Sequence, residues 1–83
     1  MGLDSVELLM EVENAFGIEL HQQDVAHVYT VEDLQILVMR MLGTVENEQA
    51  IYDKLVQLIS RQMNIPPERI KPDSSLTKDL GID

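Results

Sequence analysis

Apolar side chains recur every three to four positions in three stretches of this chain, a spacing typical of amphipathic helices. The first stretch runs from Ser5 to Phe16, the second from Val31 to Leu42 and the third from about Asn47 to Met63. No stretch shows the alternation of apolar and polar residues that is typical of a half-buried strand. The pattern therefore predicts an all-α fold, a small helical bundle with three main helices.

The expected helix boundaries carry residues that commonly cap helices. They are Asp4 with Glu7 and Gly17 for the first helix, Thr30 with Asp33 and Gly43 for the second, and Asn64 for the third. A short helical turn is expected over Asp24 to Val28, and another over Pro67 to Arg69, with Ile70 packing inward. The last segment, "KPDSSLTKDLGID", is expected to be an ordered loop that Leu76, Leu80 and Ile82 anchor to the core.

At 83 residues the chain has room for one small domain. Apolar residues make up 45% of it and aromatic residues only 4%, so aliphatic side chains must fill the core. The absence of cysteine excludes disulfides and zinc-thiolate sites. With neither a membrane-spanning run nor a secretory signal, a cytoplasmic protein is expected. The predicted core consists of Leu8, Leu9, Val12, Phe16, Leu34, Leu37, Val38, Leu55, Leu58 and Ile59.

The net charge of −9 argues against binding to nucleic acid, because phosphate contacts require clustered Lys and Arg. Such a charge favours association with basic surfaces on partner proteins. Taken alone, it is also what keeps a small domain soluble.

Ser5 is the main candidate for a functional residue, as the acceptor of a covalent modification and not as a catalytic nucleophile. A serine hydrolase needs a histidine base and an oxyanion hole, and no G-x-S-x-G motif surrounds Ser5. The two histidines, His21 and His27, lack further ligands at metal-binding spacing, so no metal site is expected. A phosphate-linked group on Ser5 would instead meet the positive end of the helix dipole. The chain is therefore expected not to be an enzyme.

The segment "GLDSVELLMEVENAFGIEL" resembles the central part of acyl carrier proteins, in which a G-x-D-S-[LV] motif holds the modified serine. The segment "TVEDLQILVMRML" resembles the last helix of that family. The tail "IYDKLVQLISRQMNIPPERIKPDSSLTKDLGID" resembles its first helix and the long loop that leads to the serine. Together these segments cover nearly the whole chain.

This resemblance implies an acyl-carrier-like bundle in which Ser5, preceded by Asp4, carries 4′-phosphopantetheine. A phosphopantetheinyl transferase would attach the group from coenzyme A, and its thiol would hold acyl intermediates of fatty-acid, polyketide or related synthesis as thioesters. The resemblance also implies that Glu7, Glu11 and Glu13 belong to the helix that acyl-transferring and acyl-modifying enzymes recognise through basic docking surfaces.

The order of the segments differs from that of the family. Residues 1–43 correspond to the serine helix and last helix, 44–49 to a connector, and 50–83 to the first helix and long loop. Either a circularly permuted carrier or a piece cut from two adjacent carriers explains this order. The near-duplicate tripeptides Gly2-Leu3-Asp4 and Gly81-Ile82-Asp83 favour the second origin. A monomer is expected over a swapped dimer, because closure within one chain avoids the entropy cost of association.

Two alternatives stay open at this point. One is a peptidyl carrier that loads an amino acid, although the acidic helix favours the acyl type. The other is an acidic helical interaction module that binds a basic partner and bears no cofactor.

Overall fold

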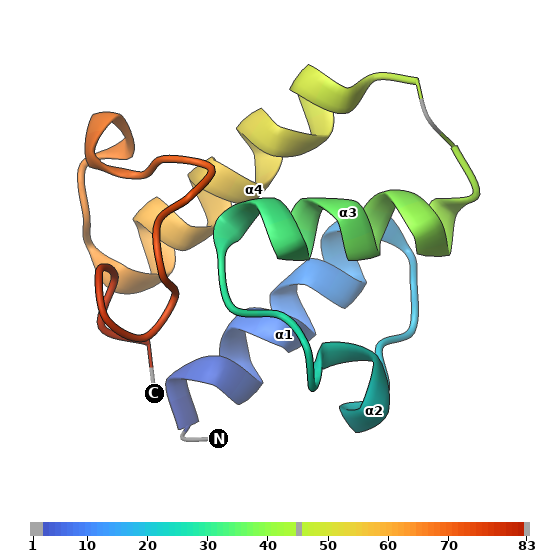
Figure 1. Ribbon diagram of the computed structural model, residues 1–83, viewed down its shortest axis with the longest axis horizontal. Coiled ribbons are helices and arrows are strands. Elements are labelled where there is room, and N and C mark those ends of the chain that lie inside the picture. The colour runs from blue at the N-terminus through green and yellow to red at the C-terminus, as the bar shows by residue number, and fades with distance from the viewer. Residues whose placement is uncertain (1–2, 45, 83) are drawn as a thin grey trace.

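Four helices form most of the protein, in a computed structural model that describes residues 3–44 and 46–82, with side chains of the first helix from Val6 onward. They are α1 (Leu3–Phe16), α2 (Gln22–Val25), α3 (Val31–Leu42) and α4 (Glu48–Met63), followed by a 3-10 turn, η1 (Pro67–Arg69), and a loop (Figure 1). Within the described residues the β-type pairing is limited to one antiparallel bridge, between Thr30 and Ser75. The prediction of an all-α bundle with three main helices is confirmed.

The start of α3 confirms the predicted capping box. The Thr30 hydroxyl accepts a hydrogen bond from the Asp33 N–H (3.1 Å), and the Asp33 carboxylate accepts from the N–H groups of Tyr29 (3.0 Å) and Thr30 (3.1 Å). These bonds, the one from Tyr29 foremost, lower the pKa of Asp33. At the other end, Gly43 adopts a φ of +69°, in the left-handed region that favours glycine, and terminates the helix as predicted.

The starts of α1 and α2 differ from the prediction. Helix α1 begins at Leu3, so Asp4 lies in its first turn and not at the N-cap. An acidic residue is favourable in both places because the N-terminal end of a helix is positive, and the residue type alone does not separate them. Helix α2 begins two residues earlier than expected, because the Asp24 carboxylate accepts from the N–H of His21 (3.1 Å) and places the N-cap there.

The connector between α3 and α4 is shorter than the predicted range 44–49. Helix α4 already begins at Glu48, after Asn47 at a φ of +60°. The buried side chain of Gln35 donates a hydrogen bond of 3.0 Å to the Glu48 carbonyl oxygen. This bond links the first turn of α4 to α3 and gives the amide nitrogen of the buried Gln35 side chain a partner.

Helix α4 packs against both α1 and α3, so the core lies between these three helices (Figure 1). Eight of the ten predicted core residues are buried, while Leu9 and Phe16 are partly buried and pack against the others. The buried apolar residues beyond that prediction are Val25, Val31, Ile51, Val56, Ile70, Leu80 and Ile82.

The loop after η1 is ordered and attached to the start of α3, as its apolar anchors predicted. Leu80 and Ile82 are buried, and Leu76 is partly buried against the core. Backbone hydrogen bonds join the two segments, from Val31 N–H to Ser74 O (3.2 Å), from Glu32 N–H to Pro72 O (2.8 Å) and from Leu76 N–H to Tyr29 O (2.9 Å). The loop therefore supplies acceptors for N–H groups that the first turn of a helix leaves free.

A side-chain hydrogen bond joins the end of α4 to the start of α1. The Gln62 side chain, near the end of α4, donates a hydrogen bond of 2.9 Å to the Glu7 carboxylate, near the start of α1. The helices of the described residues include none with the length and apolar character needed to cross a membrane.

Candidate functional site

Ser5 lies in the first turn of α1, where backbone N–H groups have no partner within the helix. The side chains of Asp4 and Ser5 lie outside the described part of the structure. Ser5 precedes Leu8 by three residues, or about 4.5 Å along the helix axis. The surroundings of the next turn therefore define what lies near the candidate attachment point.

An apolar cavity of about 380 Å³ begins at that next turn. It lies between α1, α2 and the loop after η1, and its volume falls in the range of small-molecule sites. Leu34 and Ile82, which are 0% and 3% exposed, form part of its buried lining. The other lining residues are Leu8, Leu9, Gln22, Val25, Ala26, Val28, Tyr29, Leu76 and Thr77. None of these residues carries a charge, so the cavity suits an uncharged apolar group.

The three acids predicted for partner recognition, Glu7, Glu11 and Glu13, have different environments. Glu7 is exposed, although its carboxylate accepts the hydrogen bond from Gln62. Glu11 is partly buried, and among the described residues its Oε2 finds no hydrogen-bond partner. Glu13 accepts a hydrogen bond of 2.7 Å from the Leu20 N–H. Glu7 is thus the most accessible of the three.

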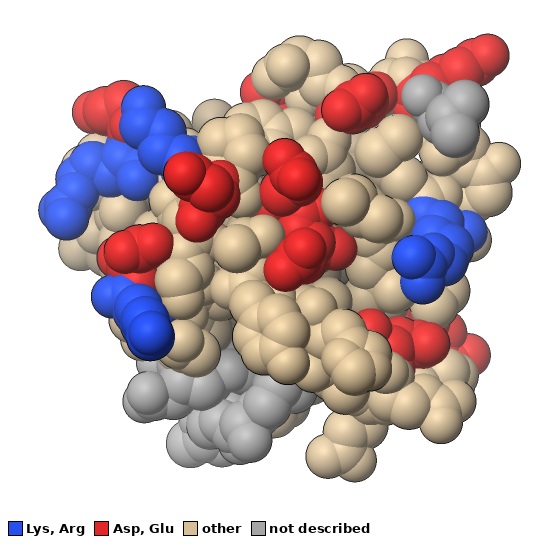
Figure 2. Space-filling view, in the orientation of Figure 1, with Lys and Arg blue, Asp and Glu red and all other residues tan. Residues whose placement is uncertain are grey.

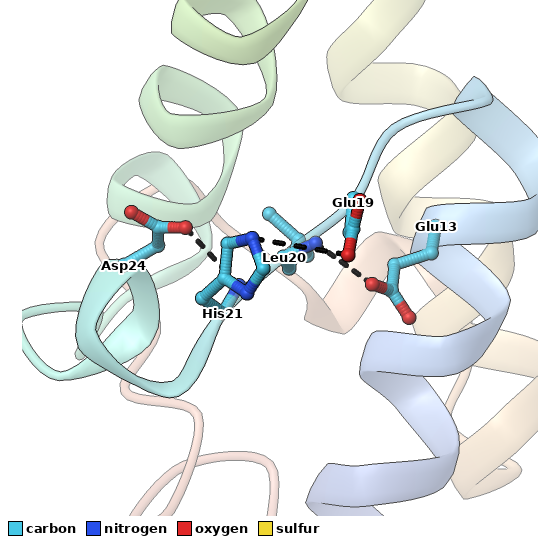
Figure 3. Close-up of polar contacts among 5 residues, drawn as sticks. All are labelled: Glu13, Glu19, Leu20, His21 and Asp24. Carbon is cyan, nitrogen blue, oxygen red and sulfur yellow. Dashed lines mark hydrogen bonds and ion pairs between the residues drawn. The ribbon is translucent and has the colours of Figure 1, made fainter.

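Glu13 holds the segment that leads from α1 to α2 (Figure 3). Its carboxylate points to Leu20, and the next residue, His21, starts α2 through its N–H bond to Asp24. The His21 ring lies 3.9 Å from the Glu19 carboxylate, at the exposed edge of this segment. These two hydrogen bonds, accepted by Glu13 and by Asp24, hold α2 beside α1 and so define one side of the cavity.

An exposed apolar pair lies on α1 beside the acids. Val6 and Met10 are 45% and 56% exposed and lie four residues apart, hence on one face of the helix. Their spacing of four residues in the sequence is a signal for such a pair, but it does not by itself show which apolar residues stay exposed. Exposed apolar side chains next to carboxylates are a common composition for a protein-binding surface.

The negative charge is unevenly distributed. Residues 1–60 contain eleven acids and two bases, whereas residues 61–83 contain four of each. On the face shown in Figure 2, acidic side chains gather across the middle, and basic ones lie toward the edges. The excess of negative charge, here called the acidic field, is therefore located in residues 1–60.

The other titratable residues have structural or surface positions. His21 and His27 are exposed, and no group of three metal-ligating side chains occurs in residues 3–44 and 46–82. Burial raises the pKa of Tyr52, whose hydroxyl donates a hydrogen bond of 3.3 Å to the Ile70 carbonyl oxygen beside η1.

Searches of protein-family models, of curated proteins and of solved structures find no significant match to this chain.

Proposed function

We propose that the protein is an acyl carrier domain and not itself an enzyme, with Ser5 as the attachment point for 4′-phosphopantetheine. The observation that carries the proposal is the uncharged apolar cavity that begins one helical turn beyond Ser5. The D-S-V-E-L sequence at the start of α1 supplies Ser5, the proposed attachment residue, and Asp4 before it.

The start of α1 suits a phosphate-linked group. A phosphodiester on Ser5 would lie beside free backbone N–H groups at the positive end of a 14-residue helix, and both features favour an anion. When bound, phosphopantetheine supplies a thiol, and this chain has no cysteine of its own. A thioester-linked chain could then lie against Leu8 and Leu34, which exclude water.

Partner recognition would centre on the exposed face of α1. Val6 and Met10 offer apolar contact, and Glu7 offers a carboxylate to a basic enzyme surface. The acidic field of residues 1–60 would speed the encounter with such a surface. Glu11 and Glu13 would contribute mainly to this field, because Glu11 is partly buried and Glu13 binds Leu20.

Attachment is tested by intact mass measurement. Incubation with coenzyme A and a promiscuous phosphopantetheinyl transferase is expected to add one prosthetic group to the wild type and to Ser75→Ala, but none to Ser5→Ala. Circular dichroism verifies that each variant is folded. An unmodified wild type, or an equal mass gain on Ser5→Ala, would contradict the proposal.

Two further measurements separate the carrier from its alternatives. Loading with amino acids but not with acyl groups in the native host would indicate a peptidyl carrier. Partners that stay bound after Ser5→Ala, with no modified form in cells, would indicate a cofactor-free interaction module.

A further inference from the structure

A second cavity lies beside the first and shares part of its lining. Its volume is about 340 Å³, and Leu9, Gln22 and Val25 line both cavities. The remaining residues around it are Val6, Met10 and Glu13 of α1, with Leu20 and His21 of the segment before α2, so this cavity opens on the exposed face of α1. The second cavity is therefore more polar than the first.

We propose that Leu9 and Val25 form a dividing wall that sets the longest apolar chain the domain can shelter. This inference rests on the proposed carrier function for the identity of the chain. The wall itself is a property of the two cavities and can be tested without a modified serine.

The burial of the shared residues identifies which of them separate the cavities. Val25 is 8% exposed, and Leu9 is partly buried against the core. Gln22 is exposed, so its side chain can move away at little cost. Separation therefore depends on the two aliphatic side chains.

The wall is also held in position. Leu9 belongs to the middle of α1, and Val25 belongs to α2. The start of α2 is fixed because the Glu13 carboxylate accepts from the Leu20 N–H and the Asp24 carboxylate accepts from the His21 N–H. Leu34 of α3 and Ile82 of the loop, both buried, also line the first cavity. A chain in the first cavity is therefore bounded by Leu9 and Val25 on the side that faces the second cavity.

The expected ligand is a straight, uncharged aliphatic chain. An apolar cavity of about 150 Å³ holds one benzene ring, and at the same density 380 Å³ corresponds to at most about fifteen carbons. Each methylene buried before the wall should increase the equilibrium constant for chain burial about fourfold. Methylenes beyond it would meet polar surface or water and add little.

The loaded protein provides the first test. The wild type carrying straight acyl groups of 4 to 18 carbons is exposed to hydroxylamine, and the rate of thioester cleavage is measured. Protection is expected to rise with chain length and to level off at or below about fifteen carbons. In Leu9→Ala and Val25→Ala the plateau should shift to longer chains, whereas Leu9→Met and the surface variant Ile36→Ala should keep the wild-type plateau.

The unmodified protein provides the second test, which does not depend on Ser5. Dissociation constants of straight 1-alkanols of 4 to 18 carbons should fall with length for the wild type up to the same plateau, and Leu9→Ala should bind alkanols longer than this plateau at least fourfold more tightly than the wild type does. Failure to attach phosphopantetheine would reject the carrier function and leave this test intact. A length dependence that is the same in the wild type, Leu9→Ala and Val25→Ala would overturn the dividing wall, as would an equal shift in Ile36→Ala.

Discussion

Lys54 of α4 donates a hydrogen bond of 2.8 Å to the carbonyl oxygen of Ala15, near the C-terminal end of α1. The same ammonium group lies 4.9 Å from the centre of the Phe16 ring. Because the last turn of α1 has no basic residue, α4 supplies the positive charge that favours a helix C-terminus. One side chain thus links the two helices and caps one of them.

Replacing Lys54 with Met should lower the free energy of unfolding by about 1 kcal/mol, because the hydrogen bond and the cation–π contact are lost while the aliphatic stem remains. Urea unfolding measures this change. Lys71→Met is the matched control, since the Lys71 side chain is exposed and this residue bonds to the Ser74 hydroxyl through its backbone N–H, and it should leave stability nearly unchanged. An equal effect of both substitutions would show that the contact contributes nothing.

Glu11 gives the opposite expectation. Its Oε2 is buried and has no hydrogen-bond partner among the described residues, so the folded state carries an uncompensated desolvation cost. Glu11→Leu should therefore raise the free energy of unfolding by about 1 kcal/mol. The control Glu68→Leu, at an exposed position of η1, should change it little. Destabilisation by Glu11→Leu would indicate that this carboxylate is stabilised in another way.

Asp33 predicts a pH dependence of stability. Its pKa is lowered in the folded state from 3.8, so its stabilising contribution is fully present above pH 3.8 and is lost as the pH falls through the lowered value. Asp33→Asn should be less stable than the wild type at pH 7, and the difference should shrink in acid. Urea unfolding at pH 7, 5, 4 and 3 measures it. A difference that is constant over this range would contradict the assignment.

Ile82 is expected to be as important to the fold as a residue within a helix. It is 3% exposed and lines the first cavity together with Leu8 of α1. Ile82→Ala should cost about 2–4 kcal/mol of unfolding free energy, whereas Ile36→Ala, at an exposed position of α3, should cost much less. Thermal unfolding compares the two, and equal losses would mean that the end of the loop does not pack as described.

Features encoded by neighbouring residues were predictable from the sequence. Thr30, Asp33 and Gly43 act within one turn of the helix that they bound, so their types and spacing suffice. The spacing of apolar residues likewise identified most of the core, because the same periodicity governs any amphipathic helix.

Features that depend on distant segments were not predictable. The partial burial of Glu11 and the bond from Glu13 to Leu20 depend on how α1 meets its neighbours. The cavity beyond Ser5 combines residues from α1, α2, α3 and the final loop, and no local pattern reports such a combination. The attachment of a cofactor to Ser5 stays a prediction.

The hydrogen bonds from Val31 and Glu32 to Ser74 and Pro72 have a consequence for how the protein forms. Their acceptors lie about forty residues later in the chain, so during synthesis these two N–H groups have only water as a partner until those residues have been added. In the finished protein, amide exchange at Val31 and Glu32 should report the release of the final loop and not the fraying of α3.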